Sequence, residues 1–179
     1  MFHPIDIELP TGYESEPTFQ ITLTNNILPN NLDLRLQNSN GAHVQSWIND
    51  RFKDKTIKQC QKEDIKCFTK HYPVPRRDNP IPRIVGAFTG LNKVTQEIPC
   101  ESINCYNIAT WLTQFKYKMK LDLSWDFYNV KVDPSTSPYL GLKFGNQYFC
   151  YTRMPMSPRN SPTFFNKWMK WFLNQLSTR

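Results

Sequence analysis

The chain has 179 residues, enough for one domain or two small lobes, and a net charge of +7 that favours anionic partners such as nucleic acids, although many basic proteins are merely soluble. No apolar run approaches the ~18 residues that a membrane span needs, and the N-terminus does not resemble a secretory signal. The five cysteines match no common zinc spacing, and we expect a reduced, intracellular protein, cytoplasmic or nuclear, that does not contact a membrane.

The first half of the chain begins with an extended arm and continues into a helix, a loop and a strand. Residues 1–42 are rich in Asn, Pro, Thr and acidic side chains, with short apolar patches that fit one or two edge strands. Residues 43–54 predict a helix, because apolar side chains recur there at helical spacing. Residues 71–82 hold four prolines and an Asp-Asn step, which predicts an exposed loop. Residues 84–88 after them fit a largely buried strand.

The second half contains an acidic residue within an alternating apolar stretch. Residues 101–115 predict an amphipathic helix, and residues 119–130 predict a strand. By the period-two geometry of a strand, Asp122 lies on the polar face, together with Lys118 and Lys120. A carboxylate held on a core strand can bind Mg²⁺, which prefers hard oxygen ligands. A lone aspartate is more often solvated or paired with a cation, so both interpretations stay open.

A tight hairpin and a long helix complete the pattern. A Gly-Asn step at 145–146 forms a two-residue connection between predicted strands at 139–144 and 147–153. A Ser-Pro step at 161–162, a cap residue followed by proline at the first helical position, opens a helix that runs to about residue 176. The order of helix, strand, hairpin and helix predicts an α+β fold.

Residues 121–130, LDLSWDFYNV, resemble the first catalytic motif of retroelement reverse transcriptases of the LTR-retrotransposon, retroviral and pararetroviral type. That motif has an aspartate between hydrophobic residues and an aromatic residue five positions later. The resemblance implies that Asp122 is a catalytic ligand of Mg²⁺ or Mn²⁺ and that the carbonyl of Leu123 assists it. It also implies that Phe127 lies against the sugar and selects deoxynucleotides, although a core aromatic residue fits the same position.

Residues 154–165, MPMSPRNSPTFF, resemble the second motif of this family, Leu/Met-Pro-Phe-Gly-x-x-Asn-Ala-Pro-x-x-Phe. By this resemblance Met156 contacts the incoming nucleotide, whereas Ser157, Asn160 and Pro162 contact the template or primer. Ser157 replaces the usual glycine and Pro158 follows it. The loop therefore departs from the family where it would lie against the nucleotide.

Residues 75–79, PRRDN, followed by Arg83, resemble the fingers hairpin of the same family, whose basic residues clamp the triphosphate. The resemblance implies that Arg76 and Arg83 bind the phosphates, and arginine suits bidentate phosphate contacts. A solvated turn is the alternative interpretation of this segment. The sequence LNKVT at 91–95 matches the Leu-Asn-Lys-x-Thr of the family.

The resemblance as a whole implies the fingers and N-terminal palm of a right-hand polymerase, with an antiparallel palm sheet backed by helices. Residues 1–42 would be the arm, 43–115 a fingers-like region and 116–179 the first part of the palm. The implied function is RNA-directed DNA polymerisation by two-metal nucleotidyl transfer. Its ligands would be an RNA or DNA primer–template and deoxynucleoside triphosphates.

Some features of the sequence favour an incomplete or non-catalytic protein. The family's Tyr-x-Asp-Asp motif, which supplies the other metal-binding carboxylate, is missing from the 179 residues, so we expect an incomplete polymerase that is inactive alone. Ala87 and Thr89 stand where the family has Asp and Arg, which favours the alternative of a non-catalytic module that binds nucleic acid or protein. In either case we expect the rest of a polyprotein, or another protein, to cover the apolar face of the last helix.

Overall fold

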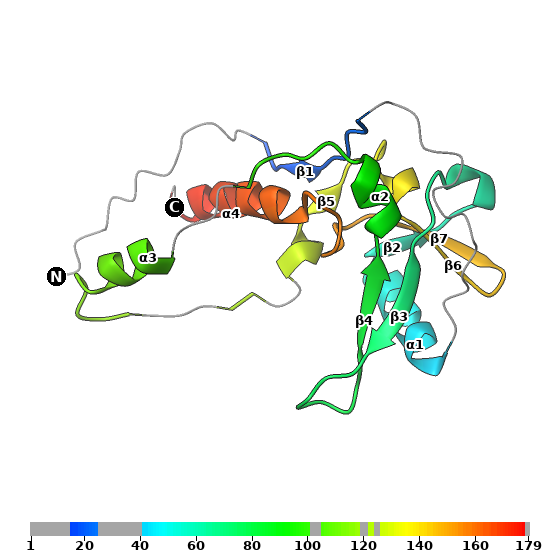
Figure 1. Cartoon of the computed structure of the whole chain (residues 1–179), viewed down its shortest axis with the longest axis horizontal. Helices are drawn as coiled ribbons and strands as arrows, with labels where there is room; N and C mark the ends of the chain where they lie inside the picture. Colours follow the sequence, from blue (N-terminus) through cyan, green and yellow to red (C-terminus); the bar gives the residue numbers. More distant parts are fainter. Residues whose placement is uncertain (1–14, 25–40, 101–104, 119–121, 124–125, 178–179) are drawn as a thin grey trace.

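The structure is a computed structural model that describes residues 15–24, 41–100, 105–118, 122–123 and 126–177. It combines helices with mostly antiparallel strands, which confirms the predicted α+β class. The strands form three small sheets rather than one continuous sheet (Figure 1). No helix in these ranges is long and apolar enough to cross a membrane.

Helix α1 (Ala42–Lys53) agrees with the predicted helix to within one residue at each end. It buries Val44 and Ile48 in the main core. Just after the helix, Lys55 adopts a left-handed conformation with φ of 61°, and the amide of Thr56 donates to the carbonyl of Arg51 at 2.8 Å. This geometry satisfies the last carbonyls of a helix and usually has glycine at the left-handed position.

A three-stranded antiparallel sheet contains β2 (Ile57–Gln59), β7 (Gln147–Tyr151) and β6 (Gly141–Phe144), with β7 in the middle. Strands β6 and β7 are joined by the predicted two-residue turn, in which Gly145 has φ of 57°. Strand β6 begins two residues later than predicted, because Ser137–Tyr139 form a 3₁₀ turn (η3) before it.

Strands β3 (Lys70–Val74) and β4 (Arg83–Ala87) form a separate antiparallel hairpin next to α1 (Figure 1). The prediction of a loop over 71–82 was therefore wrong for its first four residues. Pro73 is tolerated in β3 because the sheet has only two strands, and each strand has a free edge that needs no amide donor. The loop itself is limited to residues 75–82.

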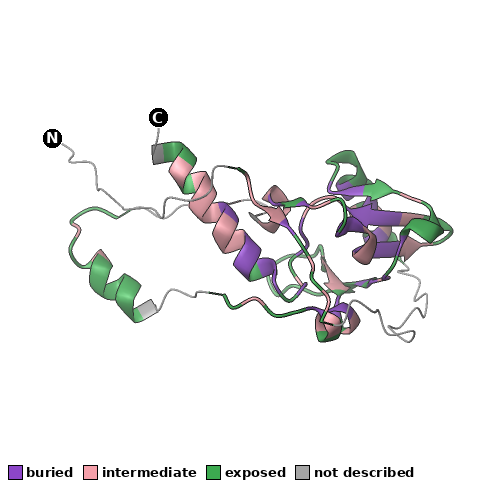
Figure 2. Cartoon of the chain, turned by 90° about the horizontal axis from the view of Figure 1, so that it is seen from above, coloured by how far each residue is buried: buried purple, intermediate pink, exposed green. Residues whose placement is uncertain are grey.

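Strands β1 (Thr18–Phe19) and β5 (Lys131–Val132) pair in parallel beside helix α4 (Ser161–Ser177). Phe19 is fully buried, and its ring meets that of Phe164 edge to face with centroids 5.2 Å apart. Part of the predicted arm is thus built into the core. Figure 2 shows the buried residues gathered in the sheets and in the first turns of α4, whereas the far end of α4 is exposed.

The described residues of the predicted strand around Asp122 do not belong to a strand. Among its described residues, 117–118 and 122–123 belong to no strand, and Asp126–Asn129 form a 3₁₀ turn (η2). Residues 119–121 and 124–125 lie outside the described ranges. The alternation of apolar and polar side chains fits a strand only where a neighbouring strand takes up the backbone hydrogen bonds, and no described strand does so here.

Shorter helices complete the described part of the chain. They are η1 (Lys62–Asp64), α2 (Thr89–Val94) and α3 (Cys105–Leu112). Helix α3 falls within the predicted helix over 101–115, but it exposes Tyr106 and Trp111 rather than burying an apolar stripe (Figure 2).

Candidate nucleotide-binding pocket

The four residues predicted to bind nucleotide line a single pocket of about 350 Å³. Arg76 lies in the loop of the β3–β4 hairpin and Arg83 opens β4. Phe127 belongs to η2, and Met156 follows β7. The remaining wall comes from α1, the hairpin and η2, and consists of His43, Ser46, Trp47, Asp50, Arg51, Ile81, Pro82, Ile84 and Tyr128.

The pocket carries a surplus of positive charge. Arg76 and Arg83 are exposed, and neither makes an ion pair with another described residue. Arg51 is paired with Asp54 at 3.0 Å, and Asp50 is the one carboxylate in the lining. Guanidinium groups that reach solvent from a pocket wall are suited to bidentate contact with phosphate oxygens.

Phe127 packs against the core and also lines the pocket. Its ring is half-buried and stacks on that of Phe165 from α4, with centroids 5.0 Å apart and an interplanar angle of 22°. Because packing fixes the ring, it forms a rigid wall, as discrimination by shape requires.

A buried polar chain supports the wall that Trp47 and Tyr128 form. Nδ1 of His71 lies 3.2 Å from the carbonyl of Thr69 and must donate, because a carbonyl can only accept. Nε2 of the neutral ring therefore accepts from the Tyr151 hydroxyl, at 2.7 Å. The His71 ring stacks on Trp47 with centroids 5.2 Å apart, and Tyr151 hydrogen-bonds with Tyr128. Burial lowers the pKa of His71 to about 4 and raises the pKa of Tyr128 to about 12, so both side chains are neutral at pH 7.

Sequence patterns contain no signal for this chain of contacts. His71 and Tyr151 lie 80 positions apart, and each residue type is common in ordinary cores. Likewise, the helical periodicity of residues 43–54 predicts α1 but not that its polar side faces the arginines. Only the packing of the hairpin on α1 brings these groups together.

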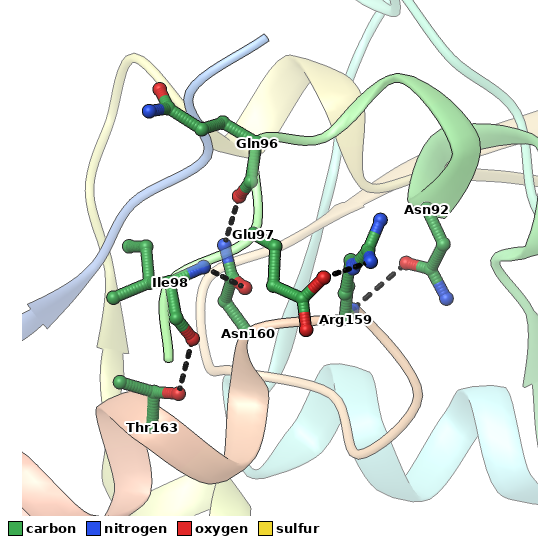
Figure 3. Close-up of polar contacts among 7 residues, drawn as sticks. All are labelled: Asn92, Gln96, Glu97, Ile98, Arg159, Asn160 and Thr163. Carbon is green, nitrogen blue, oxygen red and sulfur yellow. Dashed lines mark hydrogen bonds and ion pairs between the residues drawn. The ribbon is translucent and has the colours of Figure 1, made fainter. Parts of the chain in front are cut away.

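The loop after β7 is attached to the end of α2, which fixes the backbone next to Met156. The side chain of Asn92 donates to the carbonyl of Ser157 at 3.1 Å and accepts from the amide of Arg159 at 2.8 Å. The Arg159 guanidinium pairs with the carboxylate of Glu97 (Figure 3). Asn92 belongs to the predicted LNKVT motif, and its contacts give that motif a structural role in holding the loop.

Asn160 is buried and its side chain is engaged by the backbone. Nδ2 donates to the carbonyl of Gln96 at 2.8 Å, and Oδ1 accepts from the amide of Ile98 at 3.1 Å (Figure 3). These contacts favour a structural role for Asn160 over the predicted contact with template or primer. Ser157 is half-buried and Pro162 is exposed in the first turn of α4, and their contact with template or primer stays a prediction.

Asp122 is exposed and does not line the pocket, whereas Leu123 is partly buried against the core. Two-metal catalysis needs carboxylates that hold both ions. Within the described ranges, no three or more His, Cys, Asp or Glu side chains come together as a metal site. One exposed carboxylate and one backbone carbonyl therefore do not fit a complete catalytic metal site.

Comparison with known proteins relates the chain to retroviral polyproteins. No protein-family model matches it. It is 30% identical over 124 residues to the Pro-Pol polyprotein of simian foamy virus type 3 (strain LK3), which covers 69% of the chain and 10% of the polyprotein. It is 31% identical over 122 residues to the Pro-Pol polyprotein of feline foamy virus, covering 68% and 10%. The chain is thus similar in sequence to a part of foamy virus Pro-Pol polyproteins. It spans about a tenth of their length.

Solved structures share its fold. The prototype foamy virus protease–reverse transcriptase CSH mutant matches with a TM-score of 0.63 at 23% identity, over 75% of the chain and 18% of that protein. A foamy viral protease–reverse transcriptase in complex with double-stranded DNA matches with a TM-score of 0.58 at 22% identity, over 75% and 22%. A foamy viral protease–reverse transcriptase in complex with an RNA/DNA hybrid matches with a TM-score of 0.58 at 21% identity, over 74% of the chain and 17% of that protein.

Proposed function

We propose that the chain is the nucleotide-binding part of a retroviral-type reverse transcriptase, corresponding to its fingers and the N-terminal part of its palm. The observation that supports this most is the common pocket of Arg76, Arg83, Phe127 and Met156, which three separate motifs implied one by one. The arginines bind the triphosphate, Phe127 lies against the sugar, and Met156 lies against the rest of the nucleotide. The nucleic acids in the solved complexes of similar fold support a primer–template as the second ligand.

In this proposal Asp122 supplies one ligand of the catalytic Mg²⁺ or Mn²⁺, and the carbonyl of Leu123 a second. The Tyr-x-Asp-Asp motif, to which the resemblance assigns the remaining carboxylate, does not occur among the 179 residues. The chain by itself therefore binds nucleotide and primer–template but does not extend the primer.

The binding half of the proposal is tested by titrating dTTP into the chain bound to oligo-dT annealed to a poly-rA template, with Mg²⁺ present, by calorimetry. Arg76→Ala and Arg83→Ala are each expected to raise the Kd by about 10-fold or more, because each removes a charge-assisted contact to phosphate. Arg77→Ala is the matched control: it removes the same charge from the same loop but from outside the pocket lining. An equal loss in all three variants would show general attraction instead of a phosphate site.

The catalytic half is tested by primer extension with Mg²⁺ or Mn²⁺ on the same substrate. We expect no product from the chain alone. Incorporation of dTTP that disappears in Asp122→Asn would refute this expectation, because it would require a complete metal site. Binding without extension also fits a second candidate, a non-catalytic module derived from such a polymerase, which the incomplete donor set around Asp122 favours. Adding the segment with the Tyr-x-Asp-Asp motif from a foamy virus relative in trans distinguishes the two candidates. Primer extension would support the incomplete polymerase, and no extension would support the non-catalytic module.

A further inference from the structure

A second concave surface of the protein is lined by basic and apolar side chains. It encloses about 730 Å³ where the end of α1, β2, β5 and the end of β7 meet, and it shares no residue with the nucleotide pocket. We call it the basic groove. All of its charged lining residues are cations, namely Lys53, Lys55, Lys58, Lys131 and Arg153.

Four of these five cations make no ion pair with another described residue. Lys131 pairs with the carboxylate of Glu16, and the Arg153 guanidinium donates to the carbonyl of Asn129 at 3.2 Å. Lys53 at the end of α1, Lys55 after it and Lys58 in β2 are exposed and make no ion pair with another residue in the described ranges. The basic groove therefore has charge available for an anionic ligand.

The backbone conformation of Lys55 is a second, independent indication that the basic groove binds an anionic ligand. It is the one non-glycine residue with positive φ in the described part of the chain, and its position just after α1 is one where glycine is the usual residue. A lysine there is strained, because its Cβ crowds the backbone in the left-handed conformation. A contribution of the Lys55 ammonium group to ligand binding would explain why a strained lysine stands at this position.

An exposed aromatic ring beside the cations indicates the kind of anion. Phe52 is 50% exposed although its ring packs edge to face on that of Phe149, with centroids 6.2 Å apart. Cations that follow a phosphate backbone, next to a ring on which a base can stack, are the features of surfaces that bind single-stranded nucleic acid. An acidic peptide would use the lysines but not the ring.

We propose that the basic groove binds single-stranded nucleic acid, with Lys53, Lys55 and Lys58 on the phosphates and Phe52 under a base. This site lies beyond the proposed nucleotide pocket and requires neither nucleotide nor metal. The basic groove would hold a nucleic-acid strand on the protein even when no nucleotide occupies the nucleotide pocket.

The test measures binding of a fluorescently labelled oligo-dT of roughly 20 nucleotides to the 179-residue chain by anisotropy, at several salt concentrations and without dTTP. The variant Lys53→Ala/Lys55→Gly/Lys58→Ala is expected to reduce the slope of log K against log salt by about 2, because each lost phosphate contact on a single strand accounts for about 0.7. The matched control Lys62→Ala/Lys66→Ala/Lys93→Ala removes the same charge from exposed positions outside both concave surfaces and is expected to keep the slope.

Lys55→Gly alone separates binding from folding. Glycine relieves the strain at this position, so we expect the Tm to rise by about 2 °C while the affinity for the oligonucleotide falls several-fold. Reduced affinity that is accompanied by a lower Tm would overturn the assignment of Lys55, since it would indicate damage to the fold.

Three further results would overturn the proposal. The control triple variant could lose as much affinity as the groove variant, which would mean that only net charge matters. Polyglutamate could compete as well as unlabelled oligo-dT, which would identify an acidic peptide as the ligand. Arg76→Ala and Arg83→Ala could abolish oligo-dT binding while the groove variant keeps it, which would place all binding in the nucleotide pocket. Failure of dTTP binding, by contrast, would affect only the proposed function.

Discussion

Asn160 uses both ends of its side-chain amide inside the protein, to the carbonyl of Gln96 and the amide of Ile98. An aspartate at this position would lose the donor and place a carboxylate against a carbonyl. We expect Asn160→Asp to lower the free energy of unfolding by about 2 kcal/mol in urea denaturation. Asn79→Asp is the matched control, because the exposed Asn79 only accepts, from the amide of Ile81, and an aspartate keeps that acceptor. Equal losses in both variants would contradict the structural role of Asn160.

His71 should make the stability of the protein depend on pH. Its pKa is lowered from 6.5 to about 4 in the folded state, so the unfolded chain binds a proton more readily than the folded one between these values. Stability from this residue is complete above about pH 6.5 and falls as the pH drops toward 4, by up to about 3 kcal/mol.

The measurement is the free energy of unfolding in urea at pH 7.5, 6 and 5, for the parent chain and for His71→Phe. The variant starts from a lower stability because Tyr151 loses its acceptor, but it should lose less than the parent as the pH falls. His43→Gln, at an exposed histidine, should keep the parental pH dependence. A parental slope in His71→Phe would mean that other groups cause the effect.

At the scale of elements, the missing side chain of Gly141 allows β6 to lie close to the segment before β3. Its amide donates to the carbonyl of Cys67 at 3.1 Å, and a Cβ on Gly141 would overlap with the side chain of Ile65. We expect Gly141→Ala to lower the free energy of unfolding by about 2 kcal/mol, because backbone must move to make room. Gly145→Asn should cost less than 1 kcal/mol, since the turn has open space and asparagine tolerates a left-handed conformation. Thermal unfolding of both variants checks the contrast.

The elements that sequence patterns predicted well are those whose signals are local. The helix over 43–54, the turn at 145–146 and the helix that starts at the Ser-Pro step at 161–162 follow from periodicity, glycine and proline within a few residues. The predicted cap is not seen, because Ser161 lies inside α4 and its hydroxyl donates to the carbonyl of Pro155 at 2.8 Å. The strand expected around Asp122 is absent from its described residues, because a strand depends on a partner that can lie far away in the sequence. The loop predicted over residues 71–82 was wrong for its first four residues, because a two-stranded sheet accepts a proline at its edge and β3 therefore extends through Pro73.

The residues of the candidate site also fall into those that local motifs predicted and those that depend on contacts between distant segments. Arg76, Arg83, Phe127 and Met156 were found through motifs, and the fold then brought them into one pocket. The contribution of α1, and the polar chain behind it, depends on contacts between distant segments that no local pattern encodes. A motif marks the position of Asn160 but does not state whether its side chain faces outward or inward, so its contacts with the backbone of Gln96 and Ile98 could not be predicted, and its contact with template or primer stays a prediction.

For the whole molecule, the segment that contains Phe19 links the N-terminal part of the chain to its C-terminal helix. Phe19 is fully buried between β5 and α4. We expect Phe19→Ala to lower the free energy of unfolding by about 3–5 kcal/mol, the usual cost of truncating a core phenylalanine. Gln20→Ala, at the exposed neighbouring position, should change it by less than 1 kcal/mol. A small effect of Phe19→Ala in urea denaturation would show that the arm is dispensable to the core.

The division of the strands into three small sheets also has a kinetic consequence. Strand β7 is paired on both sides, whereas β3 and β4 pair with each other and with no other named strand in the described ranges. Local opening of the hairpin thus breaks fewer hydrogen bonds than opening of the central sheet, and its amides should exchange with deuterium sooner. Since the hairpin carries Arg76 and Arg83, a ligand held by both arginines would slow that exchange. The residence time of the ligand would then depend on how often the hairpin opens.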